Sequence, residues 1–124
     1  MFNDGESAPV SIAAIEDYPS IRIVRLRGPI DHATVAEIER FRVWVMKHPG
    51  FKRKHILLDF KQVTNINSAA VAGIIQAVAE LKSNHFRLGA IHVNEFFSDM
   101  FRVLMVHKWI TLYKDESEAL EGLK

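Results

Sequence analysis

The chain has 124 residues, of which 48% are hydrophobic and 25% charged, and its formal net charge is +1 at pH 7. This size and composition are typical of one globular domain with its own core, and the near-neutral charge gives no reason to expect binding to nucleic acid or a membrane surface. The absence of cysteine excludes disulfides and thiolate metal sites.

No apolar run approaches the roughly 18 residues of a membrane-spanning helix, so we expect no direct membrane insertion. The segment Met1–Ser7 is acidic and polar, unlike a secretory signal. By elimination the sequence predicts a cytoplasmic protein. Residues 1–8 are expected to form a flexible tail and residues 9–124 the domain.

The first part of the chain predicts two strands and a helix. A short strand over Ser11–Asp17 is followed by turn residues and by a β-branched strand over Ile21–Arg27. The arginines of this second strand indicate that it is not buried on both faces. Gly28–Pro29 should break it, and Asp31 or Thr34 can then cap a helix that ends before Pro49.

The middle of the chain predicts a buried strand, a loop and a long helix. Ile56–Phe60 is an almost continuous apolar run, typical of a central strand covered by helices. Lys61–Asn67 reads as a loop, and a helix should begin within two residues of Ser68. Ser68 can cap that helix while its hydroxyl stays near solvent. A phosphate on the hydroxyl would lie in the favourable field of the helix N-terminus.

The last part predicts a strand over Phe86–Val93, a helix from the cap Asn94 to about Val106, a short strand over Ile110–Tyr113 and a helix opening at Asp115. This alternation of strands and helices predicts a single α/β domain with a four- or five-stranded sheet. The first strand should lie at an edge, because a short turn joins it to the second.

The third helix is crowded with large apolar side chains. Its aromatic and methionine residues cannot all face one core at 3.6 residues per turn. Phe97, Phe101 and Leu104 are expected to face inwards, whereas Phe96 and Met100 are expected to be exposed. Such a pair would form a contact surface, unless neighbouring loops cover it.

Several short motifs follow one another along the chain: Gly28–Asp31, Ile56–Asp59, Val63, Asn67–Ala72, Ile110–Tyr113 and Ser117–Leu120. In their order and spacing they resemble those of STAS domains, the bacterial anti-sigma-factor antagonist family, over about residues 8–122. Within the helix-opening motif the chain departs from the family pattern. Asn67 stands for an aspartate, Ala69 for a second hydroxyl residue, and Ala70 and Ala72 for two glycines.

The resemblance implies a mixed sheet with about four helices packed mainly on one side. It also implies a non-enzymatic domain without a cofactor, which acts by partner switching in transcription regulation. Ser68 matches the residue that a partner serine kinase, itself the anti-sigma factor, phosphorylates in the family. A phosphate adds about −1.5 to −2 charges at the contact surface, and would thereby weaken binding to that partner.

We expect the partner to contact the segment before and around Ser68 together with the third helix, in a protein that is a monomer or a weak dimer. The expected partner-binding residues are Asp31, Thr64, Asn65, Asn67, Ser68, Ala69, Phe96 and Met100.

Two other functions stay open at this point. One is a phosphorylation-independent scaffold, either within a larger STAS assembly or regulating a transporter or lipid-handling complex. The other is a small-ligand binder at the loops of Asp31 and Asn67. Catalysis and metal binding have little support, because Ile66 and Ala70 replace the small flanking residues of a hydrolase serine and no metal-binding histidine spacing occurs.

Overall fold

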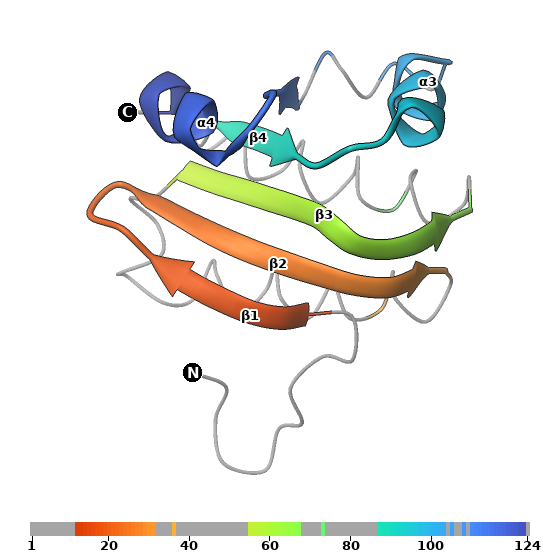
Figure 1. Ribbon diagram of the computed structural model, residues 1–124, viewed down its shortest axis with the longest axis horizontal. Helices are drawn as coiled ribbons and strands as arrows, with labels where there is room; N and C mark the ends of the chain where they lie inside the picture. The colour runs from red at the N-terminus through yellow and green to blue at the C-terminus, as the bar shows by residue number, and fades with distance from the viewer. Residues whose placement is uncertain are drawn as a thin grey trace, which may run out of the picture.

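The computed structural model describes residues 12–31, 36, 55–67, 73, 87–103, 105, 108 and 110–123. Within these residues, five strands form one mixed sheet in the order β1-β2-β3-β4-β5 (Figure 1). The strands are β1 (Ile12–Asp17), β2 (Ile21–Ile30), β3 (His55–Ile66), β4 (Leu88–Ile91) and β5 (Thr111–Leu112). β1 pairs antiparallel with β2, and every other pair is parallel. The α/β fold class, the edge position of β1 and the central position of β3 are as predicted.

The two longest strands extend further than predicted. β2 does not break at Gly28–Pro29 but continues to Ile30, because Gly28 takes a left-handed φ of 69° and the register with β3 shifts between Gly28 and Pro29. The expected loop Lys61–Asn67 was also wrong, since β3 runs on to Ile66. Val63 and Ile66 are buried there and hold the second half of β3 in the sheet.

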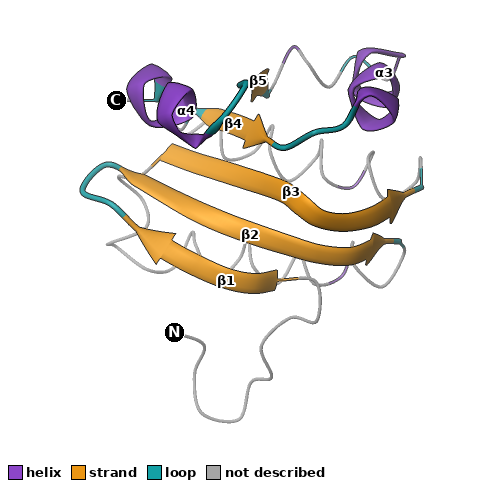
Figure 2. Cartoon of the chain, in the orientation of Figure 1, coloured by secondary structure: helices purple, strands orange, loops and turns teal. Residues whose placement is uncertain are grey.

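The sheet is buried on both faces. One apolar cluster, which includes Val24, Ile56 and Ala90, packs against α3 (Glu95–Val103). The alternate residues Ile23, Leu57 and Ile91 form a second cluster with α4 (Glu116–Gly122). Because side chains alternate along a strand, α3 and α4 lie on opposite faces of the sheet; Figure 2 shows both helices beside it.

Of the two other predicted helices, only Ala36 and Gly73 lie within the described residues, and both are helical. The start of the helix near Ser68 therefore falls outside what the structure describes. The same holds for the expected tail, residues 1–8. No helix of the described ranges is long and apolar enough to cross a membrane.

The expectation that the second strand is not buried on both faces holds for its second half, where Arg27 is exposed, and was wrong for its first half. There Ile21, Arg22, Ile23 and Val24 are all buried, and Arg22 is only 6% exposed. Its Nε donates a hydrogen bond to Asp17 on the neighbouring edge strand. This ion pair allows a charged side chain to lie inside a strand that is covered on both faces.

Candidate functional site

The carboxyl ends of β2 and β3 lie side by side at one edge of the sheet. Ile30 pairs with Ile66, and both side chains are buried. The backbone N–H of Asn67 donates to the carbonyl oxygen of Ile30 at 3.1 Å, so the pairing extends one residue beyond β3. Asp31 and Asn67, which directly follow the paired residues, are thereby brought to the same place.

The surface at this edge is polar. Thr64, Asn65 and Asn67 are exposed, and Asp31 is partly buried. Thr64 and Asn65 belong to β3 and not to a loop: Asn65 pairs with Pro29 of β2, and Thr64 lies at the register shift just before it. A rigid strand therefore presents these side chains, which reduces the ordering cost of a partner contact.

Ser68 and Ala69, the centre of the predicted site, lie outside the described residues. The chain enters this segment from Asn67, whose backbone is hydrogen-bonded to β2. Of the predicted partner-binding set, the structure places four polar residues at the strand ends and two apolar ones on α3. The four at the strand ends are Asp31, Thr64, Asn65 and Asn67.

Helix α3 begins at the edge where the parallel strands finish (Figure 1). As predicted, Asn94 caps it, its Oδ1 accepting a hydrogen bond from the Phe97 N–H at 2.8 Å. Phe97 and Phe101 face the core, and the Phe101 ring meets Phe60 edge-on at a centroid distance of 5.6 Å. The helix ends at Val103, short of the expected Val106.

The expected exposure of α3 side chains is confirmed for Phe96, which is 67% exposed. For Met100 the expectation was wrong, because its side chain is partly buried and packs against the core. A third apolar side chain, Val103, is 79% exposed and was not singled out from the sequence. It stands seven residues after Phe96, so the helical period places both on one side of α3.

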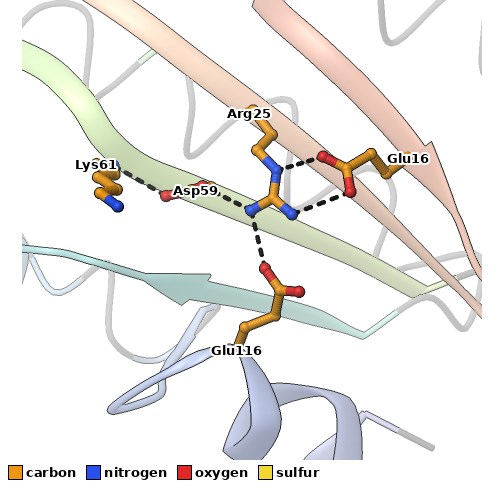
Figure 3. Close-up of polar contacts among 5 residues, drawn as sticks. All are labelled: Glu16, Arg25, Asp59, Lys61 and Glu116. Carbon is orange, nitrogen blue, oxygen red and sulfur yellow. Dashed lines mark hydrogen bonds and ion pairs between the residues drawn. The ribbon is translucent and has the colours of Figure 1, made fainter.

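Sequence reasoning also missed a network centred on Arg25 (Figure 3). Its guanidinium donates to both carboxylate oxygens of Glu16, at 2.6 and 3.1 Å, and through Nη1 to Asp59 Oδ2 at 2.7 Å. The same Nη1 lies 2.9 Å from Glu116 Oε1 on α4. One signal was available in the sequence: a carboxylate inside the apolar run Ile56–Phe60 needs a cationic partner.

Arg25 and its carboxylate partners stabilise each other's charged forms. The hydrogen bonds to Glu16 are the largest cause that raises the pKa of Arg25; burial acts in the opposite direction, and Asp59 and Glu116 raise it further. Reciprocally, the Arg25 hydrogen bonds lower the pKa of Glu16. The network joins β1, β2, β3 and α4, so its role in this structure is to hold these elements together.

No group of three or more His, Cys, Asp or Glu side chains within the described ranges is placed to hold a metal ion. The polar strand ends and the exposed side of α3 are surfaces that can contact another molecule. Comparison with known proteins identifies the family of the chain. The model of the STAS domain family matches residues 13–119 of the chain. The chain belongs to the STAS domain family.

Solved structures show the same fold. An anti-sigma factor antagonist from Mycobacterium paratuberculosis is 20% identical, with a TM-score of 0.74 over 95% of this chain and 98% of that one. The anti-sigma factor antagonist SpoIIAA in its unphosphorylated form is 17% identical, with a TM-score of 0.69 over 88% and 93%. The phosphorylated form of SpoIIAA, a Bacillus cell fate determinant, is 18% identical, with a TM-score of 0.63 over 90% and 98%.

At these identities the likeness establishes the fold shared by this STAS domain and the antagonists. A comparison with curated protein sequences finds no match. The STAS membership places the chain among non-enzymatic domains.

Proposed function

We propose that this STAS domain is a partner-switching regulator of the anti-sigma-factor antagonist type, which binds an anti-sigma factor with serine kinase activity and is switched by phosphorylation of Ser68. The observation that carries the proposal is the polar edge at the ends of β2 and β3, where Asn67 is anchored to Ile30 directly before the serine. The likeness to SpoIIAA, solved both without and with phosphate, supports it.

The proposed contact surface has two parts. Asp31, Thr64, Asn65 and Asn67, with Ser68 and Ala69 beyond them in the chain, supply the polar part. Phe96 and Met100 supply the apolar part, as aromatic and methionine side chains often do at interfaces. A phosphate on Ser68 would bring about two negative charges into a contact that must lose water to form, so binding would weaken without refolding.

The test is calorimetric titration of the domain with the anti-sigma kinase of the same organism. Ser68→Asp should weaken binding at least tenfold, and Ser68→Ala should leave it nearly intact. A lost cap would cost only about 0.5–2 kcal/mol of stability, so both variants should fold. Equal affinity for all three proteins would refute the switch and favour the phosphorylation-independent scaffold.

A second measurement checks the phosphoacceptor itself. The domain is incubated with that kinase and ATP, and the phosphate is mapped by peptide mass spectrometry. Ser68→Ala should abolish the label, whereas the control Thr111→Ala, at an exposed position of β5 outside the proposed contact surface, should retain it. Phosphate on Thr64 alone would overturn the assignment to Ser68.

A further inference from the structure

Helix α3 carries two parallel rows of side chains on its outer surface. The apolar row is Phe96, Met100 and Val103, of which Met100 is partly buried, and the charged row is Glu95, Asp99 and Arg102. Both rows follow the spacing i, i+4, i+7, one residue apart, so they run side by side along the outer surface of the helix. The buried residues Phe97 and Phe101 hold the opposite side against the sheet.

The charged row is asymmetric along the helix axis. Glu95 lies in the first turn, Asp99 at the middle of the helix and the guanidinium of Arg102 in the last turn. Within one chain this row forms an exposed ion pair between Arg102 Nη1 and Asp99 Oδ1 at 3.3 Å. An acidic and a basic end on the same row would match the same row of an antiparallel copy.

We propose that a second copy of this chain occupies the outer face of α3, forming an antiparallel, two-fold symmetric helix pair. A two-fold axis midway between Phe96 and Val103 passes between Asp99 and Met100. Each Phe96 then faces Val103 of the second copy, and the two Met100 side chains meet near the axis. Such an isologous contact is the commonest form of homodimer.

The same axis arranges the charges. Along the helix axis, Arg102 of the second copy lies level with position 97 of the first copy. This level is midway between Glu95 and Asp99 of the charged row. Each guanidinium is thus placed between two carboxylates one turn apart, and this happens twice in the symmetric pair. Antiparallel helices also set their dipoles in opposition. A parallel arrangement would instead place like charges together, which disfavours it.

The contact is small. A nine-residue helix is only about 13 Å long at 1.5 Å per residue, so the pair would fall in the class of weak, transient interfaces below about 1,200 Å². The dimer should therefore form reversibly at high protein concentration. The inference rests on α3 alone and does not depend on the phosphorylation switch, although a partner that binds Phe96 would compete with the second copy.

The experiment is sedimentation equilibrium of the full chain alone, from about 10 µM to about 1 mM, the range of weak association. The mass should rise from monomer towards dimer. Phe96→Asp should weaken association at least tenfold, and the control Tyr18→Ser, which changes another exposed aromatic residue away from α3, should not change it. Monomer at every concentration, or association that survives Phe96→Asp, would overturn the proposal.

Charge reversal gives the sharper test. The double variant Glu95→Lys, Asp99→Lys and the single variant Arg102→Glu each make the charged row uniform, so each alone should remain monomeric. Mixed in equal amounts they should associate at least as well as the unmodified chain. Failure of the mixture to associate, with both variants folded by circular dichroism, refutes the antiparallel pairing. Ser68→Asp should associate normally, so this result is separable from that of the partner titration.

Discussion

His55 shows how one residue at the start of a strand can make stability depend on pH. Its Nδ1 accepts a hydrogen bond from the backbone N–H of Arg87 at 3.0 Å, which requires an unprotonated nitrogen. Burial, and next the nearby charge of Arg87, lower the pKa of His55 below its ordinary value of 6.5. The folded state therefore favours the neutral imidazole.

The unfolded chain binds the His55 proton at pH values where the folded chain does not. The free energy of unfolding should thus fall as the pH drops below 6.5 towards the lowered pKa of the folded state. Urea titrations between about pH 5.5 and pH 7.5 measure this slope. His55→Gln keeps an acceptor but cannot titrate, so its slope should be shallower; an unchanged slope would contradict the assignment.

At the scale of the elements, Arg25 is the side chain that ties α4 to the sheet. Arg25→Met would leave Asp59, which is 5% exposed, without its cation. Since Arg25 itself is 19% exposed, the expected loss lies between the values for exposed and buried pairs, about 2–3 kcal/mol. Amide hydrogen exchange in α4 should accelerate as well.

Two variants serve as controls for the Arg25 prediction. Arg25→Lys keeps the charge but cannot make the bidentate contact of a guanidinium, so it should recover only part of the stability. Arg102→Met removes an exposed ion pair, and at low protein concentration it should cost less than about 0.5 kcal/mol. If Arg25→Met costs no more than Arg102→Met, the network does not hold α4 in place.

The sequence predicted the order of the elements well because the apolar run Ile56–Phe60 and the cap Asn94 are strong local signals. It could not predict the length of β3. Opposite Arg25–Pro29, β3 uses two residues more than β2, at the shifts between Arg25 and Arg27 and between Gly28 and Pro29. The buried residues then recur every third position, at Phe60, Val63 and Ile66, a period that indicates neither helix nor strand.

The sequence indicated Asp31 and Asn67 but not the length of the strands that bring them together. It ended the second strand at Arg27 and the third at Phe60, whereas both strands run on and their parallel pairing brings the two residues to the same place. The sequence also did not predict that Arg25 contacts carboxylates on three other elements. No local pattern specifies which of many surface acids will meet one arginine. The family resemblance supplied Ser68, which local spacing alone would assign as a helix cap.

At the scale of the whole molecule, the two apolar clusters share one sheet. Neighbouring residues of β3, Ile56 and Leu57, belong to opposite clusters, so the faces should not unfold separately. Phe101→Ala and Leu123→Ala each empty a fully buried position and should each cost about 2–5 kcal/mol. Both should shift a single unfolding transition monitored by circular dichroism and fluorescence. Two separate transitions in Leu123→Ala would contradict this coupling.

The parallel pairing of β2 with β3 has a consequence for the folding rate. Ile21 pairs with His55, so the centre of the sheet joins residues 34 positions apart in the chain. A β-hairpin closes over a few residues. This pairing instead closes a long loop, and the entropy cost of closure comes before the stabilising contacts form. Among the strand pairs that the structure describes, only β1–β2 is local. The domain should therefore fold more slowly than a helical bundle of its size, with β1 and β2 able to pair before the centre of the sheet forms.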